Sequence, residues 1–421
     1  MPNVVRASVP VVVAQHVADA AALRNARSRL AGAPHVRLLH LGRLDARLAA
    51  HLDGIAVAAS FGARLVHAAL ETPGIGEVFA ATVCHIGRGD RAGIEKMFAL
   101  VQAVPASQAG LLSAFGWCSA ALLEGIGRVL LAHQDPFARY VGIAACAMHR
   151  VDPGPALNAA LASDHTALRA RALRCAGESG RCDLLPACLE HGADADPDCA
   201  FWAAWSAVLL GARGGAVDRL IQHCRPPGPY RDRALQLVLK TLDMPAAHAL
   251  LQALAPDPAH QRRLLRGAAV VGDPYYVPWL IAQMSDLSKA RLAGESFSVI
   301  TGLDLAARDL ETKPPNNFSS GPTDHPDDDN VAMDEDDGLP WPAPVRLQAW
   351  WDANHMRFEP GVRYFMGERL TVEHCKKVLR DGFQRQRVAA VEYLCLLTPG
   401  TPWFPTSAPA WRQQRWLRQT G

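Results

Sequence analysis

Residues 135–154 read DPFARYVGIAACAMHRVDPG, an apolar segment that begins at one Asp-Pro pair and ends at another. Within it, Val141, Ala144, Ala145 and Met148 recur at the spacing of one helix face. Asp accepts hydrogen bonds from the free N–H groups of a first helical turn, and Pro has no N–H group to leave unpaired there. The segment therefore predicts an amphipathic helix between two turns.

The same pattern continues on both sides, at intervals of roughly thirty residues. Turns that would lie inside helix pairs align at Asp135-Pro136, Asp164-His165, Asp196-Pro197, Pro226-Pro227, Asp257-Pro258 and Asp286. A single helix pair cannot bury its own apolar side, whereas stacked neighbours can. The sequence therefore predicts an all-α protein, a HEAT-like α-solenoid of antiparallel helix pairs with about 30 residues per repeat.

Changes in composition divide the chain into four segments. We expect a helical N-terminal cap over residues 1–72 and the repeat array over residues 73–308. Residues 309–345 are rich in Pro, Gly and Asp, cannot bury apolar area and predict an acidic flexible loop. Residues 346–421 predict a Trp- and Arg-rich C-terminal helical cap, with helices over 372–379, 384–397 and 410–417.

Net charge and cysteine usage narrow the class of protein. The 421 residues carry a formal net charge of +2, which gives no field to attract nucleic acid or anionic lipid. The ten cysteines form no Cys-x-x-Cys pair and predict reduced, buried thiols. The longest uncharged stretch, residues 97–123, is broken by Pro105 and predicts two helices rather than a membrane span. We therefore expect a cytoplasmic protein.

Arginines follow the internal turns by one to two helical turns, as at Arg139, Arg169, Arg231, Arg262 and Arg291. One interpretation is a basic stripe on the surface. The favoured interpretation is a ladder in which each Arg pairs with a turn Asp of the adjacent repeat, because Asp and Arg recur in step.

No standard catalytic signature is present: the sequence has no phosphate-binding Gly-rich loop, no Gly-x-Ser-x-Gly and no His-Glu-x-x-His. The spacing of His16, His35, His40 and His51 does not place two on one helix face, so no zinc site is expected. The acids of the loop, from Asp324 to Asp337, lack the calcium-loop spacing. We therefore expect no enzyme, no cofactor and no metal.

The candidate partner-binding residues are aromatic and basic residues near the C-terminus: Trp350, Trp351, Arg385, Arg387, Trp411, Arg412, Arg415 and Trp416. Such residues anchor protein interfaces. Two other interpretations remain open. Arg beside Trp is also typical of nucleic-acid binding, which the net charge disfavours. Alternatively the Trp side chains close the last apolar face of the stack.

Several motifs resemble a family of uncharacterised bacterial HEAT-repeat-like proteins that are often encoded beside type VI secretion genes. They are FEPGVRY (358–364), GERLT (367–371), GFQRQRVAA (382–390) and APAWRQQRWL (408–417), with PHVR (34–37), AHLDGI (50–55) and ITGLD (300–304). The resemblance implies an accessory chaperone or adaptor that helps load a secretion effector.

These features lead us to expect a non-catalytic protein-binding scaffold whose partner is a secretion effector or its carrier, with no nucleic acid and no membrane. The alternatives are an immunity protein that blocks a toxin and a repeat-type enzyme such as a lyase. An enzyme needs a pocket with converging polar groups of shifted pKa, and the sequence offers no such set.

Overall fold

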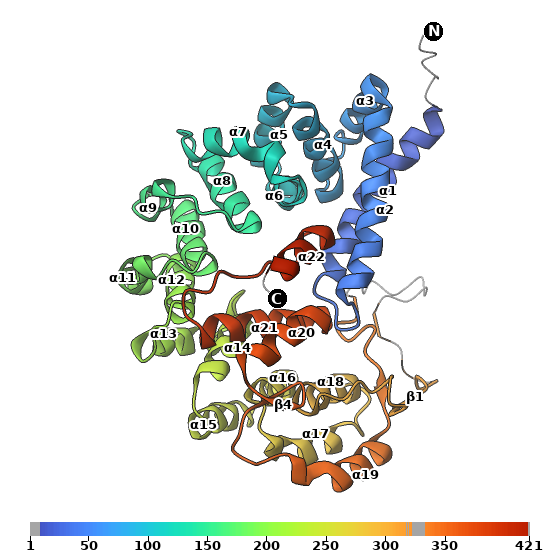
Figure 1. The fold of residues 1–421 in the computed structure, drawn as a ribbon, viewed down its shortest axis with the longest axis vertical. Coiled ribbons are helices and arrows are strands. Elements are labelled where there is room, and N and C mark those ends of the chain that lie inside the picture. The colour runs from blue at the N-terminus through green and yellow to red at the C-terminus, as the bar shows by residue number, and fades with distance from the viewer. Residues whose placement is uncertain (1–8, 317, 319, 322–332, 420–421) are drawn as a thin grey trace. The chain divides into compact units, whose positions relative to one another are not determined.

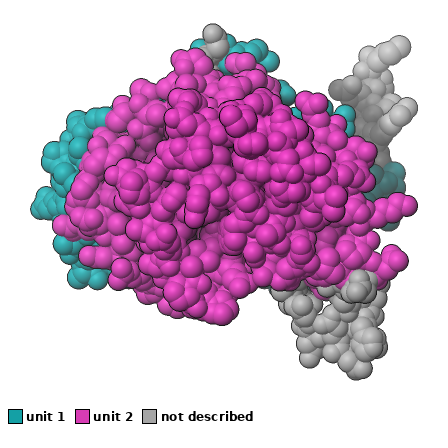
Figure 2. Space-filling view, turned by 90° about the horizontal axis from the view of Figure 1, so that it is seen from below, with its two compact units in different colours: residues 1–32, 36–206, 400–421 teal, residues 33–35, 207–399 magenta. Residues whose placement is uncertain are grey.

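The computed structural model describes residues 9–316, 318, 320–321 and 333–419. The protein is mostly helical: 22 α-helices and little strand form within the described residues. The expectation of an all-α chain is thereby confirmed. The chain folds into two compact units. Unit 1 comprises residues 1–32, 36–206 and 400–421, and unit 2 comprises residues 33–35 and 207–399 (Figure 2).

Unit 1 contains α1 (Pro10–Leu30), α2 (Leu38–Val57), α3 (Ala59–Ala69), α4 (Ile75–Arg88), α5 (Arg91–Ala103), α6 (Gln108–Trp117), α7 (Ala120–Leu131), α8 (Pro136–His149), α9 (Pro155–Leu161), α10 (Thr166–Glu178), α11 (Leu185–Glu190) and α22 (Ala410–Gln419). The boundary between the units falls within α12 (Pro197–Leu209). From α4 onward, alternate helices pack against one another in order: α4 contacts α6, α6 contacts α8 and α8 contacts α10 (Figure 1).

Unit 2 contains α13 (Gly215–Cys224), α14 (Arg231–Thr241), α15 (Met244–Leu254), α16 (Gln261–Val271), α17 (Val277–Gln283), α18 (Ala290–Thr301), α19 (Pro344–Asn354), α20 (Val372–Asp381) and α21 (Gln384–Leu397). Here α14 packs on α16, and α16 on α18. Two short antiparallel pairings were not anticipated: β1 (Glu311–Thr312) with β2 (Trp341–Pro342), and β3 (Tyr364–Phe365) with β4 (Glu368–Arg369).

The expected turns lie where helices begin. Asp135 caps α8 by accepting from the Phe137 N–H, and Asp196 accepts from the Cys199 N–H at the start of α12. Residues 97–123 include the end of α5, a 3-10 turn at Pro105–Ser107, all of α6 and the start of α7, so the expected turn at Pro105 is present but three helices rather than two share the stretch. Among the described residues no helix is long and apolar enough to span a bilayer.

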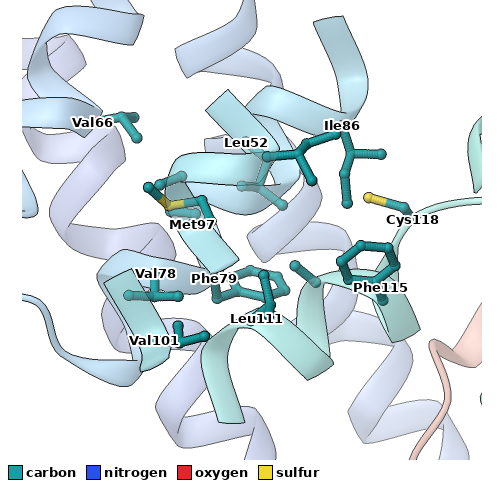
Figure 3. Close-up of a cluster of buried hydrophobic side chains, with 14 of the residues drawn as sticks. Leu52, Val66, Val78, Phe79, Ile86, Met97, Val101, Leu111, Phe115 and Cys118 are labelled. Atoms are coloured by element: carbon teal, nitrogen blue, oxygen red, sulfur yellow. The ribbon is translucent and has the colours of Figure 1, made fainter. Parts of the chain in front are cut away.

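The core of unit 1 gathers side chains from α1 to α8 (Figure 3). Phe79 of α4 and Leu111 and Phe115 of α6 are almost fully buried, which matches the close packing of these two helices. Burying such a side chain stabilises a fold by roughly 1.5–3 kcal/mol. The cysteine side chains are mostly buried as well: seven of the ten are buried, and Cys182 is exposed.

The acidic loop expected over residues 309–345 begins and ends near the β1–β2 pairing. Asp324, Asp327, Asp328 and Asp329 lie outside the described residues. Among the acids that are described, Asp334, Glu335 and Asp336 make ion pairs with helix arginines.

Candidate functional site: an aromatic groove in unit 2

A groove of about 1340 Å³ runs over unit 2. One wall is built from α15, α16, the 3-10 turn Pro274–Tyr276 and α17. The other wall is built from α19, the 3-10 turn His355–Arg357, and the chain from Phe358 to Arg369. The lining is mostly apolar and includes several aromatic side chains.

An aromatic ridge, formed by Tyr275, Tyr276 and Trp279, lies along the first wall. The ring centroids of Tyr275 and Tyr276 are 5.3 Å apart, and those of Tyr276 and Trp279 are 6.4 Å apart. His248 of α15 stacks on Tyr275 with 5.4 Å between centroids. Tyr275 is 65% exposed and Trp279 is 37% exposed, so the ridge presents large apolar area to solvent.

Asp273 anchors the backbone at the start of the ridge. This carboxylate is 1% exposed and accepts from the Tyr275 N–H at 2.9 Å, His248 Nε2 at 3.0 Å and the Gly361 N–H at 3.1 Å. Since Gly361 belongs to the opposite wall, one buried carboxylate joins both sides of the groove. Burial, followed by the Asp273 charge, raises the pKa of Tyr276 to about 12, so its hydroxyl stays protonated at neutral pH.

The second wall combines a packed base with a polar rim. Trp351, Phe358 and Tyr364 belong to the unit 2 core, with 5.5 Å between the centroids of Trp351 and Phe358. Glu359 and Arg369 form an ion pair at the rim, where both side chains are well exposed. Met356 is 87% exposed and adds a flexible apolar side chain.

The candidate residues of the sequence analysis are divided between the two units. In unit 2, Trp351 lines the groove but is 8% exposed, and Trp350 packs edge-on against Phe297. Arg387 is fully buried and donates to the Leu379 carbonyl at 2.7 Å, so it holds α20 and α21 together. Arg385 is half-buried and pairs with Glu295 at 2.8 Å.

In unit 1, the remaining four candidates lie on α22. Arg412 is buried and donates to the carbonyls of Gly116, Trp117 and Cys118 at the end of α6. Trp411 is 39% exposed and meets Trp117 edge-on. Trp416 packs on Phe404, and Arg415 is exposed. The structure thus uses part of this helix for internal packing.

None of the ridge residues is among the candidates predicted from the sequence. Gly272-Asp273-Pro274 has the composition of a turn, and Trp279 and Leu280 are adjacent apolar residues. Leu280 is fully buried, but Trp279 reaches solvent. A usable signal is present in PYYVPW (274–279), where three aromatic residues share one short segment with two prolines.

The structure brings together His16 and His51 from two different helices, a pairing that their spacing along one helix did not indicate. Their Nδ1 atoms lie 3.1 Å apart across α1 and α2, and Asp19 lies 3.6 Å from His51 Nδ1. No set of three or more metal-binding side chains gathers within the ranges that the structure describes.

The chain matches no protein-family model, no curated protein and no solved structure. The class of protein is therefore described by its own fold and groove: it is a mostly helical protein with an exposed aromatic groove in one of its two units.

Proposed function

We propose that this chain is a non-catalytic protein-binding scaffold and that the groove of unit 2 is its partner-binding site. The observation that carries the proposal is the ridge of Tyr275, Tyr276 and Trp279, which is open to solvent and whose backbone Asp273 anchors at the Tyr275 N–H. Tyr and Trp dominate binding energy at the centres of protein interfaces. Tyr and Trp side chains also lose little entropy when a partner binds, because they have only two side-chain torsions.

The size of the groove supports a macromolecular partner. Pockets for small molecules typically enclose roughly 300–1,000 Å³, and this groove measures about 1340 Å³. We infer that the occupant is a protein segment presenting apolar side chains to the ridge, with polar atoms facing the Glu359–Arg369 rim.

We further propose that the helices form a HEAT-like α-solenoid of antiparallel pairs. The support is the order of packing within each unit, in which alternate helices succeed one another from α4 to α10 and from α14 to α18. Solenoids of this kind stack repeats that contact only their neighbours and use their extended surface for binding.

The biological role that we propose is that of a cytoplasmic adaptor or chaperone that helps load a type VI secretion effector. Its support is the family resemblance of motifs such as FEPGVRY (358–364), which borders the groove. An immunity role predicts a different phenotype, because an immunity protein protects cells when it is expressed alone with the toxin.

The test compares three forms of the full-length protein: wild type, Trp279→Ala and Val345→Ala. Val345 is 84% exposed on α19 and does not line the groove, so its variant is the control. The co-purifying partner from the native cell is identified, expressed and titrated by calorimetry. We expect Trp279→Ala to weaken binding by roughly 2 kcal/mol, about thirtyfold, and Val345→Ala to leave it unchanged. Equal affinities for all three forms would refute the groove as the binding site.

A further inference from the structure

Four arginines form a basic surface on unit 2: Arg262 and Arg266 on α16, Arg291 on α18 and Arg385 on α21. Arg262 and Arg266 keep about a third of their side-chain surface exposed, at 36% and 31%. Arg291 is 9% exposed. Because α16 packs on α18, the arginines of these two helices lie on a continuous part of the unit.

An acidic segment of the same chain, Asp334 to Asp336, covers this basic surface. Asp336 accepts a bidentate pair from Arg262 at 2.7 and 2.9 Å. Glu335 accepts from Arg266 at 2.8 Å, and Asp334 lies 2.7 Å from Arg291.

Backbone contacts complete the same arrangement. Arg291 donates to the Asp336 carbonyl at 3.1 Å, and Arg385 donates to the Glu335 carbonyl at 2.8 Å. Three consecutive acidic residues thus contact four arginines from three helices, through both side chains and main chain. This is how an extended acidic peptide is bound by an arginine cluster.

The repeats elsewhere neutralise their arginines differently. Arg169 pairs at 2.9 Å with Asp194, beside the turn of the next repeat, as the ladder predicts. Arg263 pairs at 2.7 Å with Asp232, which lies within helix α14 rather than in a turn. Arg262 and Arg291 instead receive their carboxylates from residues 334–336, within the segment that interrupts the repeats. For Arg262, Arg266 and Arg291, then, the counter-charges come from outside the helices, whereas Arg385 also pairs with Glu295 of α18.

We propose that the basic surface binds an acidic peptide segment of a partner protein, and that residues 334–336 are an intramolecular competitor for it. The complementarity of charge carries the proposal, because the chain's own acidic segment already shows which ligand the four arginines accept. Glu335 is 65% exposed, and its ion pair with Arg266 contributes little because water screens it. Asp334 and Asp336 are more buried, at 17% and 5% side-chain exposure, so a partner segment must supply carboxylates to Arg262 and Arg291 as well in order to replace residues 334–336. The four arginines do not line the aromatic groove, so a negative result at one surface leaves the other proposal unaffected.

The test uses a fluorescent peptide of ten aspartates and the full-length protein in low salt. The variant Asp334→Asn/Glu335→Gln/Asp336→Asn removes the competitor's charge while keeping its shape. A surface that its own segment covers in nine of ten molecules binds about tenfold more weakly than an uncovered one. We therefore expect the triple variant to bind the peptide at least about tenfold more tightly than wild type.

The matched control is Asp218→Asn/Asp352→Asn/Glu373→Gln, which removes three exposed carboxylates elsewhere in unit 2 and changes net charge equally. We expect its affinity for the peptide to remain near that of wild type. Adding Arg262→Gln and Arg266→Gln to the triple variant should abolish the gain. Equal affinities of the triple and control variants would overturn the proposal, as would tighter binding of an oligonucleotide of equal charge.

A second measurement needs no variant. Hydrogen exchange of the wild-type protein is compared with and without saturating peptide. The Asp336 N–H donates to the Asp334 side chain at 2.9 Å, and the Leu339 N–H donates to the Asp336 carbonyl at 3.0 Å. Displacement should accelerate exchange at both amides. Saturation with unchanged exchange there would refute the competition.

Discussion

Individual arginines show why residue type alone misleads. Arg412 is a candidate partner anchor by composition, yet it is buried and donates to three carbonyls at the end of α6. The last carbonyls of a helix carry partial negative charge, so a guanidinium is well placed there. Arg412 and Gly116 are 296 positions apart, and no local pattern relates them. A single sequence gives no sign of a pairing over such a separation.

His149 leads to a prediction about pH. Burial, and then the charge of Arg412, lowers the pKa of His149 from 6.5 to about 4, although its hydrogen bond to the Phe115 carbonyl opposes this. The unfolded chain therefore takes up a proton below pH 6.5 that the folded chain resists. Stability that is present above pH 6.5 is lost as the pH falls toward 4. At about 1.4 kcal/mol per pKa unit, the loss amounts to roughly 3 kcal/mol.

The variant His149→Gln tests this, because its amide is neutral throughout and can still donate to Phe115. Urea unfolding of both forms is followed at pH 7, 5.5 and 4.5. We expect the wild type to lose up to about 3 kcal/mol relative to the variant across this range. A stability difference that stays constant with pH would contradict the assignment.

At the scale of helices, the sequence is informative because capping and apolar spacing are local properties. The helices expected over 372–379, 384–397 and 410–417 are present as α20, α21 and α22, with ends shifted by at most two residues. The β1–β2 and β3–β4 pairings were missed, since two-residue strands carry no alternating pattern. The ridge was missed because burial of Trp279 depends on which neighbour covers it.

Two glycines of α4 give a matched pair of substitutions. A Cβ atom on Gly76 would lie 2.5 Å from the Ala21 carbonyl oxygen of α1, so the two helices would have to separate. A Cβ atom on Gly87 would meet nothing within 4 Å. Alanine within a helix is otherwise favoured over glycine by roughly 0.5–1 kcal/mol.

We therefore expect opposite effects on thermal stability. Gly76→Ala should destabilise the protein by about 1–3 kcal/mol through overpacking. Gly87→Ala should stabilise it by roughly 0.5–1 kcal/mol. Calorimetry of both variants checks the pair, and a stabilising Gly76→Ala would show that α1 and α4 are not in close contact.

At the scale of the whole molecule, unit 1 is discontinuous in sequence. Its boundaries differ from those of the four segments predicted from composition. Residues 400–421 were expected to continue a C-terminal cap, whereas the structure groups them with residues 1–32 and 36–206. The Ala410 N–H donates to Asp45 of α2, and Arg27 of α1 donates to the carbonyls of Ser407 and Ala408. Asp45 itself is fully buried.

This arrangement predicts the effect of ending the chain at Pro399. Asp45 and the carbonyls of α6 would lose donors, and each unsatisfied buried group costs about 1–3 kcal/mol. We expect faster hydrogen exchange in α2 and α6, with unchanged exchange in α16 and α18 of unit 2. A peptide of residues 400–421 added in trans should restore protection. Unaltered exchange in α2 and α6 would disprove the dependence.

Because unit 1 combines segments from both ends of this sequence, the order of synthesis affects when its hydrogen bonds can form. Translation at about 5–20 residues per second delivers residues 400–421 tens of seconds after α1 and α2 have emerged. During that interval the carboxylate of Asp45 still lacks the Ala410 N–H, and Arg27 still lacks the carbonyls of Ser407 and Ala408. Helices α1 and α2 leave the ribosome well before residues 400–421 and thus acquire their full set of native hydrogen bonds only late in synthesis.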